Sequence, residues 1–287
     1  DFAMPTMPPS RPSLSWRRPV MVTEESEPSP QGPIPATTVF LTASPCPIGC
    51  WMCDLHRNTL PGPVPPGAIP EQIDAALVGR PRSGWLKLYN SGNFFDPQSI
   101  PQTDYEAIAR RCTDFSRLVV ENHPRFGQDR LLRFRDLLAV PLEVAVGLET
   151  VQPRWLDRLG KRMTRDDFDR YAKWLSSQGV DLRVFLIIGA PGISVQESVR
   201  WVRLSIRHAV MASARHISLI PARVGEGWGG RGDRLPCLST ETLAEIQRFA
   251  LRDVDGRAMV TIDLWDIDQR DPGFNELQQR NLDQLVR

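Results

Sequence analysis

The most chemically distinctive residues of this 287-residue chain are three cysteines within residues 46–53. Cys46, Cys50 and Cys53 have the spacing C-x3-C-x2-C, which suits three corners of a cubane iron-sulfur cluster because thiolates are the usual ligands of such clusters. A fourth iron without a protein thiolate keeps coordination positions open for a substrate or cofactor. The run therefore indicates an enzyme with a reactive iron.

Two simpler interpretations of the same run are a structural zinc site and three unrelated thiols. Zinc normally takes four ligands, and His56 is the only nearby candidate for the fourth. Cys112 and Cys237 each stand without a C-x2-C partner, so we expect them to be packing residues. They do not provide the ligands for a second cluster.

Net charge and hydropathy indicate which kinds of partner and which compartment to expect. The chain has 35 basic and 34 acidic side chains, a net charge of +1, so it has no overall field that would attract a nucleic acid or a membrane. No run reaches the roughly 18 apolar residues of a spanning helix, and we find no secretory signal pattern. An odd number of cysteines, five, fits a reducing compartment. We therefore expect a cytoplasmic protein.

The chain divides into three parts by composition. Residues 1–36 are rich in Pro, Ser and Glu without apolar periodicity, which predicts a flexible, disordered tail. We expect residues 37–225 to form the catalytic domain and residues 226–287 to form a short C-terminal extension that packs on it. The length is sufficient for one large domain with a sizeable core.

Beyond the tail, short apolar runs bounded by turn residues alternate with segments of helical length. This alternation is typical of βα units with a parallel sheet, and six units predict an α/β fold with a partial (β/α)6 barrel. A further strand is possible after a helix at 241–252. In βα barrels the chemistry lies on loops after the carboxyl ends of the strands. The predicted strands are residues 38–41, 85–89, 118–121, 142–146, 182–188 and 216–220, with the possible addition at 259–262.

Polar or glycine-rich sequence follows most of these strands, as this rule requires. Small residues permit close approach of the backbone to a ligand, and strand-end carboxylates can hold polar groups. An ordinary Asn-Gly turn and solvated glutamates remain the alternative explanations. The candidates are Asn90, Ser91 and Gly92 after the second strand, Glu121 at the end of the third, Glu149 at the end of the fourth, and Gly189 and Pro191 after the fifth.

The cysteine run and these loops together resemble the radical S-adenosylmethionine (SAM) superfamily. Residues 89–97, 147–150 and 159–189 are also similar to the branch that contains the Elongator catalytic subunit and the archaeosine-synthase radical lyase. The resemblance covers about residues 38–220. It implies a partial barrel, a 4Fe-4S cluster on the three cysteines, and reductive cleavage of SAM to a 5'-deoxyadenosyl radical that abstracts hydrogen from a substrate. It also implies an external one-electron reductant of the flavodoxin or ferredoxin type.

The resemblance assigns roles to the candidate residues. Asn90, Ser91 and Gly92 replace a Gly-Gly-Glu-like sequence that contacts the amino group of SAM. Glu121 and Glu149 stand where related enzymes hold the methionine carboxylate and the ribose hydroxyls.

The adenine pocket is implied by two other parts of the chain. Gly189 and Pro191 belong to a turn that resembles the one lining this pocket. Met52 occupies the position before the last cysteine, where an aromatic residue is usual, and we expect its adaptable side chain to pack on adenine.

The substrate is open at this level. We favour a small molecule or a modified nucleoside because the net charge is near neutral. The alternatives are an archaeosine-lyase-like enzyme acting on a lysine-modified deazaguanine of tRNA, and a non-catalytic iron-sulfur binding or sensor module. A tRNA substrate would need basic contacts, and these arginines either provide them or form solvated helix faces: Arg125, Arg130, Arg133, Arg135, Arg200, Arg203 and Arg207.

A glycine-rich run at residues 225–232 follows the sixth strand. It is too rich in glycine for regular structure, so it is either a substrate lid or a plain loop. A phosphate cradle would normally lead directly into a helix, and the residues that follow do not resemble a helix start.

Overall fold

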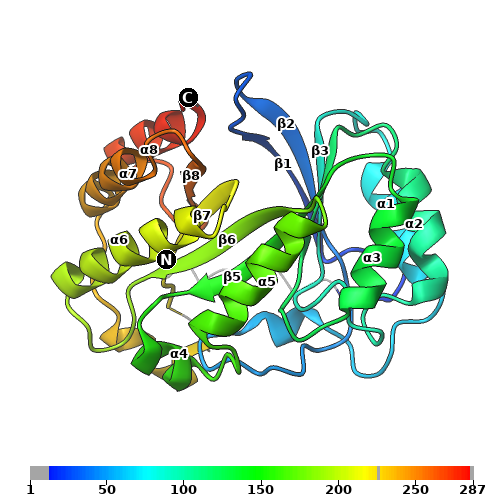
Figure 1. The fold of residues 1–287 in the computed structure, drawn as a ribbon, viewed down its shortest axis with the longest axis horizontal. Coiled ribbons are helices and arrows are strands. Elements are labelled where there is room, and N and C mark those ends of the chain that lie inside the picture. Colours follow the sequence, from blue (N-terminus) through cyan, green and yellow to red (C-terminus); the bar gives the residue numbers. More distant parts are fainter. Residues whose placement is uncertain (1–12, 225–226, 285–287) are drawn as a thin grey trace, which may run out of the picture.

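The computed structural model describes residues 13–224 and 227–284, which form one curved sheet with helices on its outer side (Figure 1). The eight strands lie side by side in the order of the sequence. The first strand is antiparallel to the second, and all the following neighbours are parallel. The strands are β1 (Met21–Glu27), β2 (Ile34–Phe40), β3 (Trp85–Tyr89), β4 (Arg117–Glu121), β5 (Leu142–Glu149), β6 (Asp181–Ile188), β7 (His216–Pro221) and β8 (Met259–Ile262).

Helices connect the parallel strands and cover the outer face of the sheet (Figure 1). Strand residues alternate between the two faces, so Leu88, Val120 and Val184 point outward into the core beneath the helices. The other face lines the inside of the open barrel. The helices are α1 (Ala68–Leu77), α2 (Tyr105–Arg111), α3 (Gln128–Leu137), α4 (Pro153–Leu159), α5 (Arg165–Ser177), α6 (Val195–Met211), α7 (Thr240–Val254) and α8 (Pro272–Leu282).

The predicted partial barrel is confirmed, and the possible strand at 259–262 is β8. It pairs with β7, so the eight-stranded sheet contains seven parallel strands where six were expected. Residues from the expected C-terminal extension therefore continue the barrel. Across residues 13–224 and 227–284, none of the helices combines the length and apolar character that crossing a bilayer would require.

The predicted flexible tail over residues 1–36 is wrong in its extent. Within it, β1 pairs along its whole length with β2, and residues 1–12 lie outside the described residues. The polar composition of β1, which contains several glutamates, led to the prediction that this segment is solvated and disordered. Glu27 is nevertheless only 5% exposed, because its partners come from distant strands inside the barrel.

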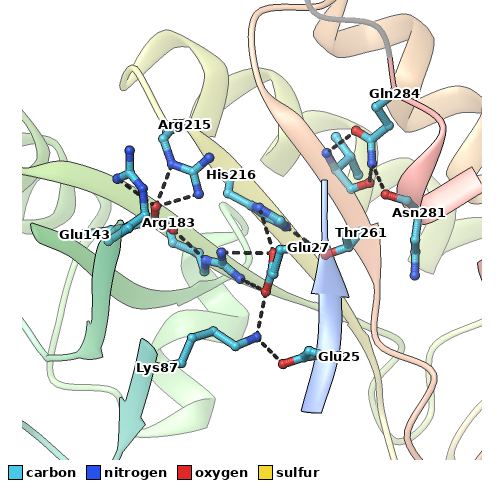
Figure 2. Close-up of polar contacts among 12 residues, drawn as sticks. Glu25, Glu27, Lys87, Glu143, Arg183, Arg215, His216, Thr261, Asn281 and Gln284 are labelled. Atoms are coloured by element: carbon cyan, nitrogen blue, oxygen red, sulfur yellow. Dashed lines mark hydrogen bonds and ion pairs between the residues drawn. The ribbon is translucent and has the colours of Figure 1, made fainter. Parts of the chain in front are cut away.

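A buried network of charged side chains fills the end of the barrel near the amino ends of its strands (Figure 2). Arg183 of β6 donates to both carboxylate oxygens of Glu27, at 2.9 and 3.1 Å, and also to Glu143 of β5 at 2.6 Å. Lys87 of β3 donates to Glu27 at 2.6 Å. Burial alone would raise the pKa of Glu27, but Arg183 and Lys87 hold it well below its usual value. This end of the barrel is therefore closed by matched charges.

The free edge of β8 is covered by side chains near the end of the chain (Figure 2). The Asn281 amide accepts from the backbone N–H of Ile262 at 2.9 Å and donates to its carbonyl at 2.8 Å. Gln284 makes the same pair of bonds with Val260. These two amides satisfy backbone groups that an edge strand would otherwise expose to another chain.

Candidate active site

The cysteine loop follows β2 and lies at the carboxyl edge of the parallel strands. Cys46, Cys50 and Cys53 are partly exposed free thiols. Among residues 13–224 and 227–284, no three or more His, Cys, Asp or Glu side chains are gathered as ligands of one metal ion. Each thiolate of a cubane cluster binds a different iron, so cluster ligands need not surround a single point.

Asn93 connects the cysteine loop to the loop after β4. Its side-chain amide donates to Sγ of Cys46 at 3.2 Å, while its carbonyl oxygen accepts from the backbone N–H of His123 at 2.8 Å. Asn93 is 2% exposed. A buried amide that donates to a sulfur stabilises negative charge on that sulfur, and hydrogen bonds to cluster sulfurs influence reduction potential.

Glu121, at the end of β4, holds the loop after β3. Its Oε1 accepts from the backbone N–H of Asn90 at 2.7 Å and from that of Gly92 at 3.2 Å. The backbone of Ser91 also bonds to this carboxyl group. Burial raises the pKa of Glu121 to about 7, although these backbone bonds oppose the shift. The structure thus gives Glu121 a role in shaping the loop that carries three of the candidate residues.

This loop packs directly on the cysteine loop. A Cβ on Gly92 would lie 3.5 Å from Cβ of Cys46. The side-chain nitrogen and oxygen of Asn90 are both buried, and neither has a hydrogen-bond partner among the described residues. A buried amide without a partner costs free energy. Such a group beside the cysteines suits a polar ligand bound at this edge.

Glu149, at the end of β5, forms a buried ion pair with Lys161. Nζ of Lys161 lies 2.8 Å from Oε1 of Glu149. A bulge between Gly147 and Glu149 and the left-handed backbone of Glu149, with φ of 65°, turn the carboxylate toward the lysine. A Cβ on Gly147 would lie 2.2 Å from that oxygen, so the pair needs glycine at this position.

Lys161 also acts on the cysteines electrostatically. Burial alone would lower the pKa of Lys161, but Glu149 and then Cys50 raise it overall. Burial raises the pKa of the Cys50 thiol, and Lys161 opposes that rise. Burial also raises the pKa of Cys53, to about 11. A buried cation beside these sulfurs favours the thiolate forms that bind iron.

His123 is a neutral neighbour of this group. Its Nε2 lies 2.8 Å from the carbonyl oxygen of Lys161. Burial, and then the charge of Lys161, lower the pKa of His123 to about 4. A neutral ring with its proton on Nε2 therefore donates to that carbonyl and holds the Lys161 segment in place.

An apolar cluster forms one side of the site. Met52 and Trp51 pack against buried Trp155, Leu159 and Trp228. A pocket beside this cluster is lined by both Glu149 and Gly189. Pro191 is partly exposed and is not among the residues that line the pocket. The lining residues are Glu149, Thr150, Trp155, Leu159, Ile187, Gly189, Ala190, Ile193, Ser198, Trp201 and Trp228.

Sequence reasoning did not assign site roles to Asn93, His123, Lys161 or Trp228. Asn93 and Lys161 lie in segments that carried the family resemblance, but their spacing gave no sign of contact with the cysteines or with Glu149. Trp228 lies in the glycine-rich run, where a single tryptophan among glycines was the only signal.

Comparison with known proteins gives distant relatives, and no family model matches the chain. An uncharacterized protein of Methanocaldococcus jannaschii is 23% identical over 190 residues, covering 62% of this chain and 52% of that protein. The beta subunit of archaeosine synthase from Methanosarcina acetivorans is 24% identical over 169 residues, covering 56% and 49%. The chain spans about half the length of the curated relatives it matches.

Solved structures share the fold. The Streptococcus suis protein SuiB, bound to S-adenosylmethionine, aligns with a TM-score of 0.58 at 10% identity, over 77% of this chain and 48% of that one. Methylornithine synthase, PylB, aligns with a TM-score of 0.58 at 14% identity, over 83% and 67%. The chain therefore has the partial-barrel fold of radical SAM enzymes, as the resemblance predicted.

Proposed function

We propose that this protein is a radical SAM enzyme whose cluster is held by Cys46, Cys50 and Cys53. One observation carries the proposal: the C-x3-C-x2-C loop lies at the carboxyl edge of a parallel half-barrel, against the Asn90–Gly92 loop and beside the Glu149–Lys161 pair. In βα barrels this edge is where the chemistry occurs.

The residues present suit such a cluster with SAM. The cysteines supply three thiolates, Asn93 donates to the sulfur of Cys46, and Lys161 balances negative charge near Cys50. The unpartnered amide of Asn90 offers a donor and an acceptor to a polar ligand. When bound, the cluster and SAM supply reductive cleavage to a 5'-deoxyadenosyl radical, with the electron delivered by a flavodoxin- or ferredoxin-type reductant.

The chain's own part is to bind and orient the cosubstrate. Asn90, Ser91 and Gly92 would contact its amino group, on a loop whose backbone N–H groups donate to Glu121. One carboxylate oxygen of Glu149 is bound by Lys161, and the carboxylate lines the same pocket as Gly189, so it suits the ribose hydroxyls.

The apolar side of the same pocket would hold the adenine. Met52 packs with the cluster of Trp155 and Ala190 that borders it, and Gly189 contributes to its lining. Pro191 acts through the turn that places Gly189. Apolar contact with a flat base needs neither charge nor a diagnostic spacing, which is why the sequence marks this part of the site weakly.

A small molecule or a modified nucleoside is the substrate class that the inside of the barrel suits best. Phe40, Tyr89 and Phe185 are partly exposed on the inner face, in edge-to-face contacts with ring centroids 6.1 Å apart. They lie above the charged network of Glu27 and Arg183. Aromatic walls over a closed, charge-balanced floor suit a compact substrate with a flat or apolar part.

The similarity to the archaeosine synthase subunit favours the tRNA alternative. The pairing of several arginines with acidic side chains argues against it. Arg203 and Arg207 both pair with Asp253 of α7, and Arg135 pairs with Asp136. These contacts reduce the positive field that phosphates would meet. A gel-shift with bulk tRNA across salt concentrations tests this alternative, since phosphate contacts would give binding at low salt with a steep salt dependence.

The cytoplasm is the compartment we propose, because the described cysteines are all free thiols and a cluster needs reduced ligands.

Anaerobic reconstitution tests the proposed chemistry. The protein is loaded with iron and sulfide, reduced, and given SAM, and 5'-deoxyadenosine is measured by chromatography. Formation that depends on Cys46, Cys50 and Cys53 is the expected result. A loaded and reducible cluster that yields no 5'-deoxyadenosine, with or without cell-extract metabolites as substrate source, would instead support a non-catalytic iron-sulfur module.

A further inference from the structure

Residues 227–236, here called the strap, tie together two separate parts of the candidate site. At one end, the backbone N–H of Trp228 donates to the carbonyl of Trp51 in the cysteine loop at 2.8 Å. At the other end, the carbonyl of Arg234 accepts from the backbone N–H of Gly192 at 2.9 Å, in the turn after β6. The strap therefore spans from the cysteine loop to the turn after β6.

The glycines of the strap are explained by its close approach to the cysteine loop. A Cβ on Gly227 would lie 2.2 Å from the carbonyl oxygen of Met52. One on Gly229 would lie 2.9 Å from Nε1 of Trp51, and Gly229 has a φ of 57°. Only residues without side chains allow the strap to come this close to the backbone of Met52 and the ring of Trp51.

Trp228 is the one residue in residues 227–230 that has a side chain, and its ring is directed inward. It is 3% exposed despite its place in a surface segment, and its backbone has a left-handed φ of 63°. This conformation costs free energy for any residue except glycine. The ring belongs to the apolar cluster that contains Trp155, and it meets the ring of Trp51 edge-to-face with centroids 5.4 Å apart. The packing of the indole therefore offsets the free-energy cost of the left-handed backbone at Trp228.

The same indole lines the pocket that contains Glu149 and Gly189. A flat aromatic wall, a carboxylate and the backbone of a glycine in one pocket match the parts of a nucleoside. The base can stack on the ring, and the ribose hydroxyls can donate to the carboxylate. The cysteine loop itself contributes Trp51 and Met52 to the apolar cluster, and neither is among the residues that line the pocket.

We propose that Trp228 is the aromatic wall on which the adenine of SAM stacks, supplied by the strap from outside the loops that carry the cysteines and the strand-end carboxylates. This inference rests on the proposed function. It makes the strap part of cosubstrate binding rather than a lid over the substrate.

Binding of two adenosine compounds to the cluster-loaded protein tests this inference without turnover. The probes are SAM and 5'-methylthioadenosine, which has the nucleoside but no amino-acid group for the iron, and affinity is measured by anaerobic equilibrium dialysis. We expect Trp228→Ala to weaken binding of both probes about tenfold, as for loss of a base-stacking ring. Trp228→Phe keeps a ring and should stay within about threefold of wild type.

Trp265→Ala is the matched control, since this tryptophan is 51% exposed and does not line the pocket. Iron content and thermal unfolding of each variant show whether the site and fold persist. Wild-type affinity in a folded Trp228→Ala protein would overturn the inference, and so would weakening that Trp228→Phe does not rescue. If either of these results is found while the wild-type protein forms 5'-deoxyadenosine, the proposed function stands and only the role of Trp228 is rejected. If a loaded wild-type protein binds neither probe, both fall.

Discussion

Nζ of Lys161 lies 2.8 Å from Oε1 of Glu149, and both side chains are buried at the carboxyl edge of the barrel. The lysine also lies close enough to Cys50 to oppose the rise of that thiol's pKa. The carboxylate, in turn, lines the pocket that we assign to the nucleoside. One ion pair thus connects the proposed cluster site to the proposed cosubstrate pocket.

Replacement of Lys161 by methionine should leave the Glu149 carboxylate buried without its partner. Removing one member of a buried pair is strongly destabilising, so we expect the free energy of unfolding to fall by about 3–5 kcal/mol. Urea unfolding measures the change, and exposed Lys173→Met is the control. The double variant Lys161→Met/Glu149→Gln should recover part of the loss. Simple additivity of the two changes would show that the pair is not energetically coupled.

Replacement of Cys50 by alanine should abolish cluster binding and leave the barrel folded, because the loop lies at the edge of the sheet and not in its core. The measurements are iron and sulfide content after reconstitution, visible absorbance, and circular dichroism. Cys237→Ala is the matched control, since Cys237 is an exposed free thiol away from the run. Full cluster content in the Cys50 variant would remove this residue from the ligand set.

Replacement of Glu149 by alanine should weaken SAM binding while the cysteines still hold the cluster. The carboxylate is the acidic group of the pocket that suits ribose hydroxyls, and loss of a hydrogen bond to a charged group costs about 1.5–3 kcal/mol, or roughly 10- to 150-fold in affinity. Titration of the reconstituted variant with SAM, alongside its iron content, checks both parts. Unchanged affinity would contradict a contact between Glu149 and the cosubstrate.

The raised pKa of Glu121 predicts a pH-dependent stability. The folded protein retains the proton of Glu121 up to about pH 7, whereas the unfolded chain releases it near the ordinary value of 4.5. The stability from the protonated group is therefore fully present below pH 4.5 and is lost as pH rises through 7. Glu121→Gln lacks this titration.

The test compares urea unfolding of wild type and Glu121→Gln at several pH values. We expect the unfolding free energy of wild type, relative to the variant, to decline from pH 4.5 to 7 and to level off above it. A constant difference across this range would mean that the carboxyl group titrates alike in both states.

Replacement of Glu27 by alanine should leave Arg183 without two hydrogen bonds and Lys87 without one inside the barrel. We expect a loss of about 3–5 kcal/mol in the free energy of unfolding, by the same argument as for any broken buried ion pair. Glu24→Ala is a control on the same strand, because Glu24 is 59% exposed and pairs at 3.6 Å with Arg80. Equal, small losses for the two variants would contradict a structural role for the network.

The sequence by itself determined the class of fold and the metal ligands that we propose. Strand runs such as residues 85–89 and 182–188 are recognisable because apolar residues between turn signals need no distant partner to identify them. The spacing of Cys46, Cys50 and Cys53 is likewise local. The positions of Asn90, Glu149 and Gly189 after their strands followed from the rule for βα barrels.

Only the tertiary structure decided how these residues are used. Glu27 meets Arg183, 156 positions away, and that contact makes an apparent tail into a strand of the sheet. Trp228 reaches Trp51 from beyond β7, and Lys161 meets Glu149 because a bulge turns the carboxylate. Each contact depends on how separate segments pack, and a local pattern of residues does not predict that packing. The physical reason is that a buried charge or ring is stabilised by its partner in space, whereas the sequence shows only its neighbours along the chain.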